Sequence, residues 1–328
     1  MSYHIQDLRL VLPSLDFDLR VNKHCAKISA PFREWLQELL CGDVALAEEL
    51  FDHKFDLLCS LCFPTIDPPQ LLRVSKLCTL TFLASDGHIQ AETSPSQWLA
   101  GGSTPHPNLL NPEHLLEVAR PIRTRRAQEL QYSPSAASGT NILLRFTGNI
   151  LSSFYSSQET DTQSSHLGVL EFSAILQNVY DRTFSEELID VALLATLWRC
   201  TTNIIVWSQD LASYTSRHLQ ECDQCTVCYS IKGRGFILQA AVNDTRRSIQ
   251  SEVGKFVHNY KSLTAHTCDN EDAVTVANAM RDCIAGFIHW IYESERYFGK
   301  RYEEVSKFGW VFTGISGTST GGNEMDIS

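Results

Sequence analysis

Residues 32–40 read Phe-Arg-Glu-Trp-Leu-Gln-Glu-Leu-Leu, and their apolar side chains recur every three or four positions. This spacing places them on one face of an α-helix. The same pattern returns in residues 71–78 and 191–198. Few segments alternate apolar and polar residues with the period of two that a half-buried strand requires. The sequence therefore predicts an all-α protein.

The bulk composition bounds the class of protein. The chain has 328 residues, 43% of them hydrophobic, and a formal net charge of −11. The negative charge argues against a nucleic-acid partner, because phosphate backbones need a basic face. No apolar run reaches the ~18 residues that a membrane span needs, and residues 1–9 lack the features of a signal peptide. We therefore expect a soluble, cytoplasmic protein, either a monomer or a homodimer.

The sequence indicates one domain with a tail. Two segments rich in Pro, Gly, Ser and Thr, residues 93–112 and 133–140, are expected to be loops because apolar helices resume after each. We therefore assign residues 1–312 to a single helical domain. Residues 313–328 are rich in Gly, Ser and Thr, and they are predicted to form a flexible tail.

The 11 cysteines are odd in number and spread along the chain, which suits reduced thiols better than a disulfide framework. Cys59 and Cys62 have the spacing of metal ligands, as do Cys222, Cys225 and Cys228. The first pair lies in an apolar run, so we expect burial as small apolar side chains rather than a zinc site.

The stretch from residue 290 to residue 300 reads Trp-Ile-Tyr-Glu-Ser-Glu-Arg-Tyr-Phe-Gly-Lys. It resembles the motif W-x-x-x-S/T-x-R-Y-F-G-K of basidiomycete-type sesquiterpene synthases. Weaker similarities to that family occur at residues 12–13, 20–24, 35, 59–64, 72–86 and 232–235. The resemblance covers roughly residues 8 to 312. It implies a class I terpenoid synthase helical bundle around a central apolar cavity.

The family resemblance also implies a chemistry. Diphosphate leaves an allylic carbon, so its negative charge must be neutralised as it develops. Magnesium ions do this while oxygen ligands hold them, and an arginine adds charged donors. The resulting carbocation then needs a dry pocket lined by aromatic rings, because water would quench it.

The family's first metal motif, D-D/E-x-x-D, corresponds here to residues 86–90, Asp-Gly-His-Ile-Gln. The resemblance implies that Asp86 binds magnesium or handles a proton. Gln90 replaces the last aspartate and keeps only a neutral carbonyl oxygen as a metal ligand. His88 is a candidate acid near neutral pH. The alternative is that Asp86 is an ordinary helix-end residue beside Gly87.

The family's second metal motif, N-D-x-x-S-x-x-x-E, corresponds to Gln209, Ser213 and Arg217, which share one helix face. Gln209 and Ser213 remain candidate ligands of magnesium and of substrate. Arg217 puts a cation where the family has a glutamate, and a guanidinium cannot bind a metal ion. Arg217 either pairs directly with diphosphate or is a solvated residue at a decayed site.

A competing set, Asp244, Ser248 and Glu252, has better ligand chemistry at the same spacing. It lies closer to the Arg-Tyr motif than the family's spacing requires, and its alternative is an ordinary polar helix face. The family's diphosphate-sensing arginine has no counterpart in residues 156–165, which contain no arginine.

The resemblance assigns Arg296 and Tyr297 to the side of the site that faces diphosphate. The alternative for Arg296 is a salt bridge at a helix end. Aromatic residues near the motifs are candidates for the substrate-binding wall, or else are core residues: Phe55, Phe82, Trp207 and Trp290.

Three functions remain open from the sequence. The first is a terpene cyclase with degraded metal motifs, which ionises farnesyl diphosphate with a reduced magnesium set near Asp86, helped by Arg217 and Arg296. The second is a repurposed enzyme that acts on a preformed terpenoid or another apolar substrate without metal, with Asp86 or His88 as the acid. The third is a pseudoenzyme without catalysis. The sequence does not specify the product skeleton.

Overall fold

The computed structural model describes residues 2–13, 16–40, 43–85, 192–214, 225–266 and 270–312, with a few positions between 169 and 184. Nearly all regular structure in these ranges is helical. The α-helices are α1 (Cys25–Leu39), α2 (Val44–Asp52), α3 (Phe55–Cys62), α4 (Pro68–Ser85), α9 (Ala192–Ser213), α10 (Thr226–Arg234), α11 (Leu238–His266), α12 (Glu271–Ile291), α13 (Glu295–Phe298) and α14 (Tyr302–Phe308). Two short 3₁₀ helices are η1 (Leu8–Val11) and η4 (Gly299–Arg301). Within the described ranges, no helix has an apolar stretch long enough to cross a bilayer.

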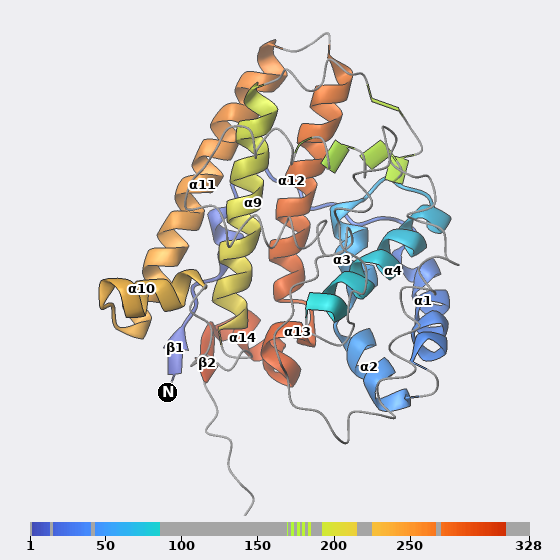
Figure 1. Ribbon diagram of the computed structural model, residues 1–328, viewed down its shortest axis with the longest axis horizontal. Coiled ribbons are helices and arrows are strands. Elements are labelled where there is room, and N and C mark those ends of the chain that lie inside the picture. Colours follow the sequence, from blue (N-terminus) through green and yellow to red (C-terminus); the bar gives the residue numbers. More distant parts are fainter. Residues whose placement is uncertain are drawn as a thin grey trace, which may run out of the picture.

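Three long helices, α9, α11 and α12, pack side by side (Figure 1). Helix α12 also packs against α3, and α3 packs against α4. The C-terminal ends of α9 and α12 lie at the same end of the bundle, beside α13 and α14 (Figure 1). This arrangement brings the segment that carries Gln209 and Ser213 to the end of the bundle that also holds Arg296.

One element departs from the all-α expectation. Strand β1 (Ser2–His4) pairs antiparallel with β2 (Trp310–Phe312), and Tyr3 lies opposite Val311. Three-residue strands are too short for a periodic pattern to reveal. Gly309, which precedes β2, has a φ of +72°, and a Cβ there would lie 2.5 Å from the carbonyl oxygen of Ile5. Only glycine fits this join without strain.

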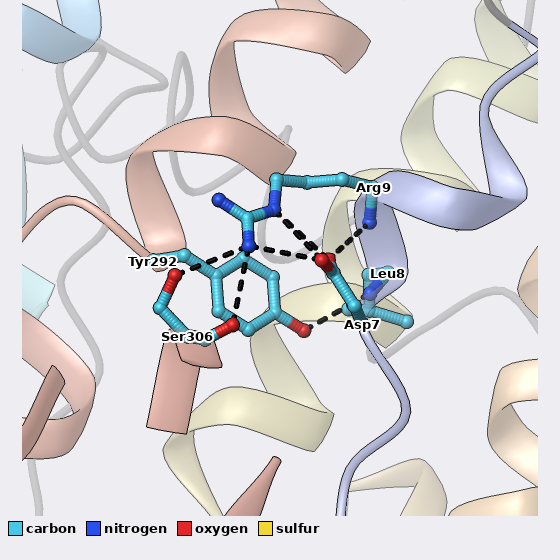
Figure 2. A network of polar contacts seen from close by, with 5 residues as sticks. All are labelled: Asp7, Leu8, Arg9, Tyr292 and Ser306. Carbon is cyan, nitrogen blue, oxygen red and sulfur yellow. Dashed lines mark hydrogen bonds and ion pairs between the residues drawn. The ribbon is translucent and has the colours of Figure 1, made fainter. Parts of the chain in front are cut away.

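The N-terminal segment is fastened to the C-terminal helices by a small polar network (Figure 2). The Arg9 guanidinium donates to Asp7 Oδ2 at 2.9 Å and to Ser306 Oγ at 3.1 Å. It also lies 4.8 Å from the centroid of the Tyr292 ring. The backbone N–H of Leu8 donates to Tyr292 Oη at 3.1 Å. Burial raises the pKa of Tyr292, so its hydroxyl stays protonated.

The cysteines that carry metal-like spacing behave as small apolar residues. Cys59 and Cys62 are buried and the described cysteines are free thiols, as expected. Burial raises the pKa of the Cys59 thiol well above its usual value, so it stays protonated. Cys225 Sγ accepts a hydrogen bond from Cys228 N at 3.1 Å at the start of α10. Cys222 lies outside the described residues.

Helices α3 and α12 approach closely at Gly286, and this contact yields a first prediction. A Cβ at Gly286 would lie 2.8 Å from the Leu61 carbonyl carbon and 2.9 Å from Cys62 N. Because these are backbone atoms, Gly286→Ala must push the two helices apart. We expect it to lower the free energy of unfolding by about 2 kcal/mol, despite the better helix propensity of alanine. Urea denaturation measures the change.

The matched control is Gly254→Ala, in α11, where an added Cβ meets nothing within 4 Å. This variant is expected to gain up to about 1 kcal/mol from helix propensity alone. Equal effects of the two substitutions would contradict the close crossing at Gly286.

Candidate active site

Arg296 lies against the end of the helix that leads to Asp86. The guanidinium carbon of Arg296 is 5.0 Å from the centroid of the Phe82 ring, within the range of a cation–π contact. Phe82 is one helical turn before Asp86, and the described part of α4 ends at Ser85. The fold therefore brings the Arg-Tyr motif beside the end of the chain segment that carries the first acidic motif.

Four of the sequence-predicted site residues lie outside the described residues: Asp86, His88, Gln90 and Arg217. Their proposed roles stay predictions. The other predicted residues can be placed individually.

Phe55, Phe82 and Trp290 pack on one another beneath Arg296. The rings of Phe55 and Phe82 are stacked with centroids 4.8 Å apart, and Trp290 lies 5.7 Å from each of them. Phe55 and Trp290 are completely buried. Trp290 Nε1 donates to the carbonyl oxygen of His53 at 2.8 Å. This packing matches the core alternative for Phe55 and Trp290, whereas Phe82 has one neighbour, Arg296, from the proposed site.

Tyr297 is held by the same cluster. Its ring meets Trp290 edge-on at 5.6 Å between centroids, and the residue is buried. Each of the two motif residues therefore contacts a different ring of this aromatic cluster. Arg296 lies over Phe82, and Tyr297 packs against Trp290. Rigid aromatic packing of this kind holds a charged group in a defined position.

Gln209 and Ser213 lie on one face near the C-terminal end of α9, and both are buried. Gln209 Oε1 has no hydrogen-bond partner among the described residues. An amide oxygen left unpaired in the interior costs about 1–3 kcal/mol, and hard cations such as magnesium favour oxygen ligands. Gln209 therefore suits the role of a magnesium ligand, with Ser213 one turn further along.

The described residues do not by themselves provide a complete metal site. They contain no cluster of three or more His, Cys, Asp or Glu side chains that could hold an ion. Asp210, the acidic neighbour of Gln209, is already used: its Oδ2 accepts hydrogen bonds from Thr226 N at 2.7 Å and from Thr226 Oγ1 at 2.9 Å. These bonds fix the first turn of α10. Asp86, the carboxylate that the sequence assigns to the metal site, lies outside the described residues.

Trp207 does not share the face of Gln209. The two residues are two positions apart, so they point roughly 200° apart around the helix. Asn203, one turn before Trp207, donates to Glu252 Oε2 of α11 at 3.4 Å. Trp207 therefore lies on the side of α9 toward α11, and the tertiary contact of Asn203 with Glu252 is what identifies that side.

The competing set on α11 has other partners. Asp244 pairs with Arg234 at 2.6 Å, and Glu252 pairs with Lys255 at 2.6 Å. Ser248 Oγ donates to the backbone carbonyl oxygen of Asp244 at 3.2 Å. Because both carboxylates are neutralised by cations, this face is less suited to a metal ion than its residue types suggest.

The chain is similar in sequence to several fungal sesquiterpene synthases. No family model matches the chain. The sesquiterpene synthase Agr1 of Cyclocybe aegerita is 23% identical over 318 residues, which cover 90% of this chain and 91% of that protein. Sesquiterpene synthase 1 of Postia placenta is 22% identical over 321 residues, covering 91% of this chain and 93% of that protein.

Solved structures give the fold. Hedycaryol synthase in complex with HEPES matches 88% of this chain and 98% of its own, with a TM-score of 0.56 and 16% identity. Germacradien-4-ol synthase from Streptomyces citricolor matches 84% of this chain and 96% of its own, with a TM-score of 0.53 and 14% identity. The chain has the class I terpene synthase fold. The fold class predicted from the sequence is therefore confirmed. In sequence, the chain is similar to fungal sesquiterpene synthases. The central apolar cavity stays a prediction.

Proposed function

We propose that the protein is a sesquiterpene cyclase, which ionises farnesyl diphosphate and cyclises it with release of diphosphate. The observation that carries the proposal is the contact of Arg296 with Phe82. It puts the Arg-Tyr pair of the family-like motif next to the end of α4, after which Asp86 follows in the sequence. Similarity to fungal sesquiterpene synthases over about nine tenths of the chain supports the substrate class.

In the proposed site, Arg296 donates charge-assisted hydrogen bonds to the diphosphate as its bond to carbon breaks. Arg217 supplies a second fixed positive charge in place of the family's last acidic ligand. Magnesium, when bound, neutralises the charge that develops on the leaving group. Its proposed ligands are all oxygen donors: Asp86, Gln90, Gln209 and Ser213.

The buried surroundings strengthen these interactions. Gln209 and Ser213 are shielded from solvent on α9, and Tyr297 is held against Trp290. Charges in such a water-poor site interact more strongly than they do in water. This compensates in part for the acidic groups that the two motifs lack.

The test is to incubate the purified full-length protein with farnesyl diphosphate, with magnesium in one tube and with EDTA in another. Gas chromatography–mass spectrometry is expected to find a cyclic sesquiterpene only in the magnesium tube. A product formed equally in EDTA would instead support acid-initiated chemistry without metal. An absence of product in both tubes would overturn the proposed function.

A further inference from the structure

Thr202 in α9 is one of several described residues with a buried hydroxyl group that lacks a hydrogen-bond partner. Its Oγ1 is buried and has no hydrogen-bond partner among the described residues. Its neighbour Thr201 donates to the Leu197 carbonyl oxygen at 2.8 Å, one turn earlier. Buried Thr79 and Thr245 make the same kind of bond. The Thr202 hydroxyl instead makes no bond to its own helix.

Thr202 lies on the same face of α9 as the second metal motif. It is seven residues before Gln209, which is two helical turns or roughly 10 Å along the axis. Gln209 Oε1 is likewise buried and has no hydrogen-bond partner among the described residues. Ser208, whose buried Oγ is also unpartnered, points to a different side. Two unpartnered polar side chains therefore line up along the motif face.

This face is distinct from the side toward α11, which the bond between Asn203 and Glu252 identifies. In the proposed cyclase it is the face toward substrate, because Gln209 and Ser213 approach the diphosphate from it. Thr202 lies two turns farther from the C-terminal end of α9 than Gln209 does, and three turns farther than Ser213 does. Its place suits contact with the hydrocarbon part of the substrate rather than with the diphosphate.

A buried hydroxyl without a partner is energetically unfavourable, and proteins usually satisfy such a group with a bound water molecule. Such a water can donate a hydrogen bond to Thr202 Oγ1. A lone pair of its oxygen then remains for a nearby carbocation. We propose that Thr202 holds a water molecule that adds to the cyclised carbocation, so that the protein releases a sesquiterpene alcohol. This inference rests on the proposed function.

The reaction balances without any further reagent. Ionisation separates diphosphate from an allylic cation, and ring closure moves the positive charge to another carbon. The water oxygen forms a C–O bond with that carbon. The surplus proton of the oxonium group passes to the released diphosphate. Farnesyl diphosphate and water thus become an alcohol and protonated diphosphate, with no oxidation or reduction.

The experiment is turnover of farnesyl diphosphate by the full-length protein with magnesium in oxygen-18 water, followed by mass spectrometry of the products. The wild type is expected to give mainly an alcohol that carries the heavy oxygen. Thr202→Val keeps the shape of the side chain but removes the hydroxyl. We expect it to lower the ratio of alcohol to hydrocarbon by about tenfold, while total diphosphate release changes by less than about threefold.

Thr201→Val is the matched control, because the Thr201 hydroxyl is bonded to its own helix. It should leave the product ratio unchanged, and Thr202→Ser should retain the alcohol. A hydrocarbon as the main wild-type product, an unlabelled alcohol, or an unchanged ratio in Thr202→Val would overturn the inference and leave the cyclase function intact. Because wild-type labelling is decisive by itself, the test survives a variant that fails to fold. No wild-type turnover would overturn both.

Discussion

Replacing Arg296 with glutamine is expected to lower the turnover of farnesyl diphosphate by about 10²–10³-fold, the usual cost of removing one charged or polar donor from a developing anion. Glutamine keeps a hydrogen-bonding side chain but lacks the positive charge and the planar fork of donors. Arg296→Lys keeps the charge, so its turnover rate should lie between those of the wild type and Arg296→Gln. The rate of diphosphate release, measured at saturating magnesium, gives the comparison.

The matched control is Arg301→Gln, a few residues away in η4. The Arg301 guanidinium pairs with Glu304 at 3.0 Å, and both side chains are at least half exposed. Such a surface pair is worth about 0–1 kcal/mol, so this variant should keep both its activity and its melting temperature. Full activity in folded Arg296→Gln would instead favour the alternative from the sequence, in which Arg296 forms a salt bridge at a helix end.

Trp290→Ala is expected to have the largest effect on stability, a loss of about 3–5 kcal/mol in the free energy of unfolding. The indole is completely buried and contacts Phe55, Phe82 and Tyr297. Removing it leaves a cavity and also leaves the carbonyl oxygen of His53 without its donor. Urea denaturation followed by circular dichroism measures the loss.

Two variants sharpen this prediction. Trp290→Phe keeps an aromatic ring but loses the bond to His53, so it should cost less than Trp290→Ala. Trp310→Ala removes a half-exposed ring from β2 and should change stability only slightly. If Trp290→Ala kept its stability and altered only the product mixture, Trp290 would belong to the wall of a substrate pocket instead of the core.

Much of the helical architecture could be predicted from local patterns. In residues 32–40, the predicted apolar face is the buried face of α1, with Phe32, Trp35, Leu36 and Leu39 all in the core. Helical periodicity is visible because every buried position lies within a few residues of the next. The pairing of β1 with β2 was not predictable in this way, because it joins the two ends of the described chain.

The same distinction between local pattern and tertiary contact applies to the residues of the candidate site. Gln209, Ser213, Arg296 and Tyr297 were proposed as site residues from motif spacing, which is a property of the chain alone. The roles of the aromatic residues were not, since Phe55, Phe82, Trp207 and Trp290 look equally suited to a pocket wall or to a core. Their neighbours decide between these roles, and those neighbours come from other helices.

The sequence by itself determined that the protein is helical and where its motifs lie, because periodicity and spacing are local properties of the chain. Only the tertiary structure decided that Arg296 lies over Phe82 and that Trp290 is buried in the core. It also decided that the Thr202 hydroxyl has no hydrogen-bond partner within the described part of the chain. Each of these depends on contacts between helices far apart in the sequence. Such contacts follow from how the helices pack, and a pattern read along one helix does not contain them.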